Sequence, residues 1–137
     1  MKRERDDERR DPQYVRDIVR AAGTIKRYLH GLHRDRFDQK EMLRDAVIRQ
    51  LGIIGEAAAN LSKLFKERHS KQPWKDIVGL RQILLHKYWK VDPNIVWSTA
   101  KKDVRTLAAY LQRMLKKSSS QLDVEIAAIL RKKPSKK

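Results

Sequence analysis

Residues 44–63 read RDAVIRQLGIIGEAAANLSK, and the spacing of their apolar positions predicts a long amphipathic helix. Apolar residues recur every three or four positions, which is the period of one helix face. The same period extends the expected helix over about residues 38–68. Gly52 and Gly55 lie near its middle, where each costs about 1 kcal/mol relative to alanine. They mark either a bend or the close approach of another helix, and the sequence leaves both open.

Three other segments show the helical period, and no stretch alternates with the period of a strand. Asp11-Pro12 and Asp92-Pro93 each combine a capping carboxylate with a proline suited to the first helical position. The connection HRDRF, at residues 33–37, is polar. The predicted helices span residues 11–33, 73–88 and 92–115. We therefore predict an all-α fold, an antiparallel bundle of four to five helices.

The 137 residues suit one domain with a single core. We expect residues 1–10 to be a disordered charged leader, since they hold one apolar residue. Residues 11–117 form the predicted helical domain, and residues 118–137 a basic C-terminal extension in which residues 122–130 can form a short helix. With no 18-residue apolar run and no signal-like segment, we expect a cytoplasmic protein without contact to a membrane.

The formal net charge of +16 is carried by the body and the tail. Residues 1–11 are neutral, whereas residues 12–111 hold twenty basic against ten acidic side chains, and residues 112–137 eight against two. Such an excess favours a polyanionic partner, because neutralised phosphates release counterions. An acidic protein partner is the alternative. The absence of cysteine excludes disulfides and thiolate metal sites.

Residues 79–88, GLRQILLHKY, hold the polar side chains best suited to chemistry. On one continuous helix Gln82 and His86 share a face, and Arg81 and Tyr88 share a second face about 140° from His86. Arg81 and His86 then meet only if the arginine wraps around the helix or if a second copy supplies the complementary half. This geometry favours a two-fold homodimer.

An arginine and a histidine suffice for RNA cleavage without a metal. His86 can take the proton of the ribose 2′-hydroxyl, because its ordinary pKa lies near working pH. Arg81 can stabilise the charge that grows on the phosphate, with Gln82 as a supporting polar residue. No metal-ligand pattern occurs, so we expect no metal site. On spacing alone, the same residues fit a solvated helix face.

The remaining polar and aromatic residues suit structural roles. His30, His33 and His69 lie at expected helix ends, where a cation interacts well with the helix dipole. Glu56 is the one acid in a long apolar run and is expected to be a buried partner of an arginine. The aromatic residues on apolar faces are expected in the core rather than as platforms for bases; they are Tyr14, Tyr28, Trp74, Trp97 and Tyr110.

The pattern Arg81-x4-His86-x-Tyr88 resembles the Arg-x4-His motif of the HEPN superfamily, and more narrowly that of the HepT toxins. The resemblance covers residues 11–116, because RDAVIRQLGIIGEAAANLSK, PWKDIVGLR and VDPNIVW flank the motif in the family's order. It implies a metal-independent endoribonuclease acting as a dimer around Arg81 and His86, the toxin of a type VII toxin–antitoxin pair.

The resemblance also implies a partner, an MntA-like nucleotidyltransferase antitoxin that transfers AMP groups from ATP onto Tyr88, alone or within a larger complex. The chain departs from the family where Gln82 replaces a short polar residue and Leu85 a small one, which leaves the level of activity open. Two other functions compete: a non-catalytic HEPN module that assists a nucleotidyltransferase, and a basic architectural binder of nucleic acids.

Overall fold

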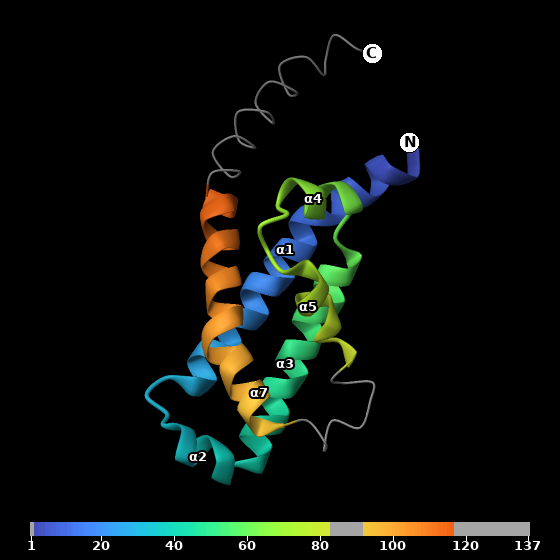
Figure 1. Cartoon of the computed structure of the whole chain (residues 1–137). Coiled ribbons are helices and arrows are strands. Elements are labelled where there is room, and N and C mark those ends of the chain that lie inside the picture. The colour runs from blue at the N-terminus through green and yellow to red at the C-terminus, as the bar shows by residue number, and fades with distance from the viewer. Residues whose placement is uncertain (1, 83–91, 117–137) are drawn as a thin grey trace.

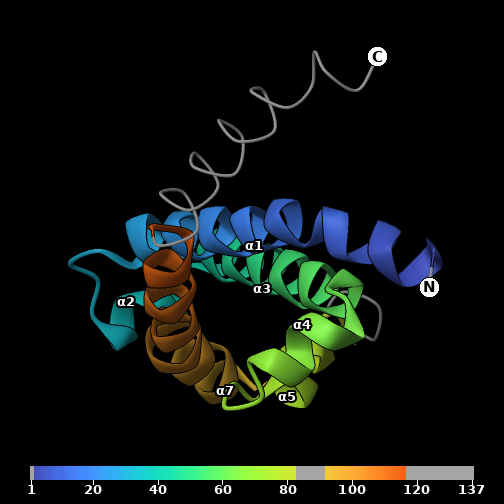
Figure 2. The same ribbon diagram turned by 90° about the horizontal axis from the view of Figure 1, so that it is seen from above.

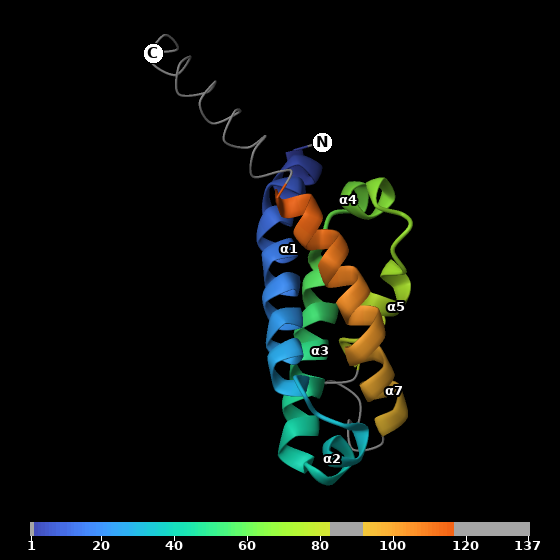
Figure 3. The same cartoon turned by 90° about the vertical axis from the view of Figure 1, so that its left-hand side faces the viewer.

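The structure is a computed structural model that describes residues 2–82 and 92–116, with side chains from residue 8 onward. The described residues form helices and connections without a strand, which confirms the all-α prediction. Figures 1 and 3 show a bundle in which neighbouring helices run in opposite directions. Its main helices are α1 (Lys2–Leu29), α3 (Glu41–Asn60), α5 (Trp74–Gly79) and α7 (Pro93–Ser98).

Apolar side chains from each of these helices meet along the bundle axis, which Figure 2 views from above. α1 and α3 form the largest contact, with Ile18 of α1 and Leu51 of α3 fully buried. Burial of one such side chain contributes about 1.5–3 kcal/mol. The largest fully buried side chains are Phe37, Ile18, Ile25, Leu51, Ile54, Leu111, Val15, Val47 and Val96.

α1 begins at Lys2, so the helix start expected at Asp11-Pro12 is wrong. Residues 2–10 are helical where we expected disorder, and their many Lys, Arg and Glu residues are good helix formers. Pro12 lies inside α1, where it removes one backbone hydrogen bond. Asp11 does not cap this helix. Its carboxylate is only 7% exposed and turns to another part of the chain.

The helix expected over residues 38–68 breaks at Ser62, between α3 and α4 (Lys63–Arg68). Ser62 caps α4, because its Oγ accepts a hydrogen bond from the Phe65 amide at 3.0 Å. The Ser62 amide and hydroxyl in turn donate to the two carboxylate oxygens of Asp11, at 2.8 and 2.6 Å. A buried carboxylate with two donors is satisfied, and it ties α1 to the corner between α3 and α4.

Residues 33–37, expected as a polar connection, enter a short helix instead. α2 (Arg34–Gln39) closes one end of the bundle and buries Phe37 completely. The Phe37 and Trp97 rings are 5.0 Å apart, so α2 is anchored on the last helical run by an aromatic pair. A single aromatic residue among four charged ones gives no helical period, which explains why the sequence did not reveal α2.

The last helical run begins where it was predicted, because the Asp92 carboxylate accepts from the Asn94 amide at 2.8 Å. α7 continues into a π-helical turn, η2 (Thr99–Asp103), and then into an α-helix over residues 104–116. Buried positions at 96, 100 and 104 are four apart and would drift around an ordinary helix. The wider π turn corrects this drift and keeps all three side chains in the core.

Among the described residues, no helix is long and apolar enough to cross a membrane.

Candidate active site

Arg81 lies in a turn that follows α5, and its position is set by Gly55 of α3. Gly55 is buried, and a Cβ added there would overlap the Arg81 amide nitrogen and stand 2.9 Å from the Leu80 carbonyl carbon. The backbone at Leu80 and Arg81 therefore packs directly on α3 where α3 has no side chain. Of the two roles left open for the glycines, Gly55 serves close approach.

The arginine is held by its backbone while its side chain remains partly exposed. The amide of Leu80 donates to Ile77 at 3.0 Å, and the amide of Arg81 donates to Val78 at 3.2 Å. Arg81 is half-buried, and its guanidinium makes no hydrogen bond or ion pair with the other described residues. In the described part of the chain, no group competes with an anion for its donors.

The expected uninterrupted helix from residue 73 past residue 88 is wrong in its described part. α5 ends at Gly79, Leu80 and Arg81 form a turn, and Gln82 is helical again and exposed. The helical-wheel relation of Arg81 to His86 and Tyr88 depends on positions beyond the described residues, so it stays a prediction. His86 and Tyr88 lie outside the described residues, and Arg81 and Gln82 are the two predicted site residues that the structure places.

Lys66 on α4 extends the positive charge near Arg81, and the sequence did not single it out. Burial lowers the pKa of the Lys66 ammonium, the Asp11 carboxylate raises it, and the Arg81 guanidinium lowers it further. The two cations therefore repel each other across the corner that the Asp11–Ser62 hydrogen bonds hold. Lys66 has other charged residues around it on α4, so its position in the sequence offered no reason to select it.

Glu56, predicted as the buried partner of an arginine, is exposed on α3, so that prediction is wrong. The buried acid of the domain is Asp11. Of the aromatic residues, Trp74 is buried as expected, and Tyr14, Trp97 and Tyr110 pack against the core. Tyr28 is 41% exposed, which contradicts the expectation for that residue.

His69 follows α4, but the structure gives it a different role from that of a cation at a helix end. Its Nδ1 lies 2.6 Å from the Tyr110 hydroxyl, and its carbonyl accepts from the Trp74 indole at 2.9 Å. Burial, and then the Arg68 guanidinium, lower the pKa of His69. The neutral imidazole is therefore favoured in the folded protein. His30 and His33 are exposed.

This lowered pKa predicts a loss of stability in mild acid. The unfolded chain binds the His69 proton more readily, so the contribution is fully present above a pH of about 6.5 and is lost as pH falls through the folded pKa. We expect the free energy of unfolding, measured with urea at several pH values, to fall less steeply in acid for His69→Gln. His30→Gln controls for loss of an exposed imidazole. Equal slopes in wild type and His69→Gln would contradict the prediction.

No group of three or more His, Asp or Glu side chains among the described residues is arranged to hold a metal ion.

Comparisons with known proteins identify relatives along most of the chain. Residues 18–114 match the family model described as "Ribonuclease HepT-like". A protein of Caldanaerobacter subterraneus subsp. tengcongensis with a provisional RNase name is 36% identical over 104 residues, 76% of this chain and 93% of the relative. A protein of Methanocaldococcus jannaschii, also provisionally named an RNase, is 38% identical over 91 residues, 66% of this chain and 84% of the relative.

A third relative, "Probable ribonuclease HepT" of Thermococcus cleftensis, is 33% identical over 103 residues, 75% of this chain and 94% of its own length. No solved structure matches the chain.

Proposed function

Because this chain belongs to the HepT-like ribonuclease family, we propose that it is a metal-independent endoribonuclease that cleaves RNA with Arg81 and His86. The observation that supports this most directly is the placement of Arg81. Its backbone is fixed on Gly55 of α3, while its half-buried guanidinium has no partner among the described residues. A cation held in this way is prepared to receive a phosphate. The relatives' names, which call them RNases, agree with this activity.

In the proposed reaction, His86 accepts the proton of a ribose 2′-hydroxyl, and the oxygen attacks the adjacent phosphorus. The bond to the 5′-oxygen of the next nucleotide breaks, and a protonated histidine supplies the proton that this oxygen needs. The products are a 2′,3′-cyclic phosphate and a 5′-hydroxyl. Arg81 stabilises the extra negative charge on the phosphate, and Gln82 provides a polar contact beside it. DNA has no 2′-hydroxyl and is not cleaved.

The net charge of +16 supports RNA as the substrate class, because a polyanion is bound with release of counterions. Lys66 adds a second cation near Arg81. We place two copies of the site in a two-fold homodimer, in which each protomer contributes to a shared cleft. His86 lies outside the described residues, so its supply by a second copy is a prediction.

We further propose that an MntA-like nucleotidyltransferase neutralises this ribonuclease by transferring AMP from ATP onto Tyr88, as in a type VII toxin–antitoxin pair. The tyrosine oxygen attacks the α-phosphorus of ATP, and pyrophosphate leaves. The added phosphate and adenine then compete with RNA for the cationic site. We expect radiolabelled AMP to enter the wild-type chain and not Tyr88→Phe when each is incubated with such an enzyme. Equal labelling of both chains would exclude Tyr88 as the acceptor.

The function is tested by incubating the purified wild-type chain with a defined RNA in excess EDTA. We expect fragments that carry 2′,3′-cyclic phosphate and 5′-hydroxyl ends, and no cleavage of a DNA of the same sequence. Loss of cleavage in EDTA would contradict metal independence, and 3′-hydroxyl ends would contradict attack by the 2′-oxygen. A chain that cleaves no RNA yet raises the ATP turnover of a nucleotidyltransferase would instead be a binding module.

A further inference from the structure

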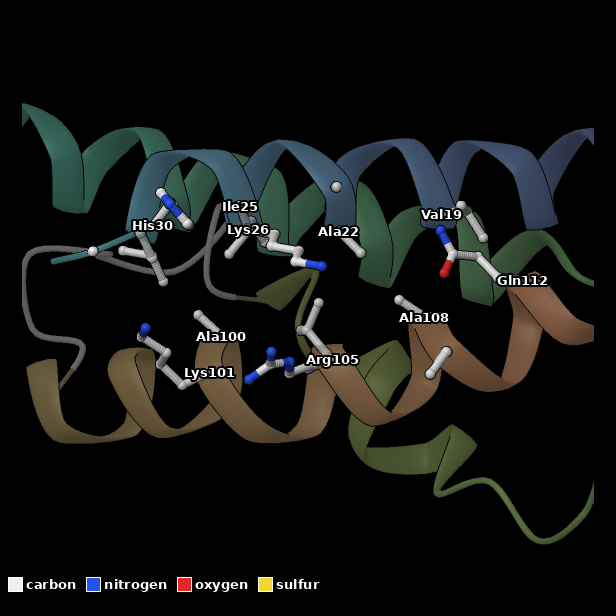
Figure 4. Close-up of a pocket in the computed structure, with 15 residues that line it drawn as sticks. Val19, Ala22, Ile25, Lys26, His30, Ala100, Lys101, Arg105, Ala108 and Gln112 are labelled. Carbon is white, nitrogen blue, oxygen red and sulfur yellow. The ribbon is translucent and has the colours of Figure 1, made fainter.

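A groove separates α1 from the helical run over residues 99–116, which lies antiparallel to it (Figure 4). The cavity measures about 280 Å³. Its walls are aliphatic, with Val19, Ile25 and Leu29 on one side and Val104 on the other. Alanine and glycine positions line the groove, and Ile25, Leu29 and Val104 at its base are already buried, so an added helix would lie over its mouth and place only side chains inside it.

The groove carries a positive charge on each wall. Lys26 and His30 belong to α1, while Lys101 and Arg105 belong to the opposite helical run (Figure 4). Among the residues that line the groove, none is acidic and none is aromatic. Nucleobases bind preferentially to aromatic platforms, so these walls suit single-stranded RNA poorly. The complementary occupant is an aliphatic helix that carries a carboxylate on either side of its apolar face.

The chain itself contains such a segment at residues 122–130, LDVEIAAIL, which lies outside the described residues. On a helical wheel, Leu122, Ile126, Ile129 and Leu130 form one apolar stripe. Asp123 and Glu125 then flank this stripe on opposite sides. The segment therefore has one negative charge for each wall of the groove, and it contains no basic residue.

The connection is long enough for the segment to reach its own groove. The described part of the chain ends at Lys116, one turn beyond Gln112, which lines one end of the groove. Residues 117–121, KSSSQ, can span up to about 17 Å, sufficient to reverse direction. A nine-residue helix is about 13 Å long, and the groove from Ala100 to Gln112 extends about 18 Å along its helix. The family match ends at residue 114, so the segment is additional to the matched domain.

From these observations we infer that residues 122–130 bind as an amphipathic helix in the groove of their own chain, antiparallel to residues 104–116. Leu122, Ile126 and Ile129 cover the aliphatic floor. Asp123 and Glu125 approach the cations of the two walls, Lys26 and Arg105. This intramolecular contact does not depend on the proposed ribonuclease activity, and its test needs no RNA.

The test uses the full-length chain, which has no cysteine and so accepts a single spin label at Ala128→Cys. Position 128 lies on the side of the wheel opposite the stripe, with Val124 and Ala127. We expect broadening of the amide NMR signals of Ala22 and Ala108, which line the groove, and none at Glu41, at the far start of α3. Broadening should not change on dilution. Its absence at the groove would overturn the inference.

A second arm asks which copy supplies the helix. Labelled, unenriched chain is mixed with unlabelled, isotope-enriched chain, so that only contacts between copies broaden signals. We expect no broadening in this sample. Broadening in this mixed sample would show that a second copy occupies the groove. Together with loss of broadening when the chain that is both labelled and enriched is diluted, it would overturn the intramolecular contact.

Charge reversal tests the pairing of the two carboxylates with the cations of the groove walls. Lys26→Glu combined with Arg105→Glu should abolish the broadening at Ala22 and Ala108. Adding Asp123→Lys and Glu125→Lys to that chain should restore it. The matched control is Lys102→Glu combined with Arg113→Glu, two exposed positions of the same helical run that do not line the groove. Broadening that survives the first pair of reversals, or that is not restored by the second, would overturn the proposed pairing.

Discussion

Replacement of His86 by alanine is expected to lower the rate of RNA cleavage by about 10²- to 10⁴-fold, the contribution of one general acid–base group. Arg81→Ala is expected to cost about 10²- to 10³-fold, because the charge on the phosphate loses its fixed donor. Both rates are measured with one RNA at saturating concentration. Arg81→Ala should not lower the unfolding temperature appreciably, since Arg81 is held by its backbone.

The matched controls are His30→Ala and Arg113→Ala, which remove the same side chains from exposed positions. These should retain cleavage. If Arg81→Ala and Arg113→Ala lose cleavage equally, Arg81 contributes only its general positive charge, and its assignment as a catalytic residue fails. Full activity of His86→Ala would remove the proposed mechanism altogether.

Mixing the two inactive chains then tests whether the site is shared between protomers. A dimer of Arg81→Ala with His86→Ala has one complete site if each site takes its arginine from one copy and its histidine from the other. Recovery of cleavage on mixing is therefore the expected result. If both residues of a site come from one chain, no mixture can contain an intact site, and cleavage stays absent.

Gly55→Ala is expected to destabilise the fold and to displace the turn at Arg81. The new Cβ would overlap the Arg81 amide nitrogen and stand 2.9 Å from the Leu80 carbonyl carbon, and both are backbone atoms that cannot rotate away. Overpacking of this kind costs about 1–3 kcal/mol, and it must move the turn that holds Arg81. A displacement of about 1 Å at a catalytic group can cost 10²-fold in rate.

Gly23→Ala on α1 is the control, because its Cβ would meet only the end of the flexible Arg27 side chain, at 3.9 Å. Within a helix this change should stabilise by about 0.5–1 kcal/mol. Urea unfolding and RNA cleavage are measured for both variants. If Gly55→Ala is as stable and as active as Gly23→Ala, then the contact between Gly55 and the Arg81 backbone does not position the site.

The helical period and the Asp-Pro start at Asp92 were sufficient to predict the bundle and the beginning of its last helix. Periodicity reports which face of a segment is apolar, and that information is local. It could not separate a helix through Ser62 from two helices that meet there, because the interruption depends on Asp11, 51 positions earlier. The same Asp-Pro pattern at Asp11 does not begin a helix, because the Asp11 carboxylate accepts hydrogen bonds from Ser62 instead of capping α1.

The candidate site was predicted less completely than the fold. Arg81 and Gln82 were selected from their residue types and spacing. The turn at Leu80 and Arg81 is set by close approach to Gly55, for which the sequence left two roles open. Lys66 could not be found, because a lysine on a charged helix resembles many others until α4 and α5 are placed together. Glu56 was misassigned because the apolar run around it was judged by position along the sequence, whereas the helical period places it on the exposed side of α3.

The hydrogen bonds from Ser62 to Asp11 join two positions that are far apart along the polypeptide. The large contact between α1 and α3 brings these two positions together, so we expect the junction to depend on that contact. The corner that carries Lys66 and leads on toward Arg81 is therefore expected to be held only when α1 and α3 are packed together. We therefore expect an incompletely folded chain not to present these two cations together, which would restrict the proposed ribonuclease activity to folded copies.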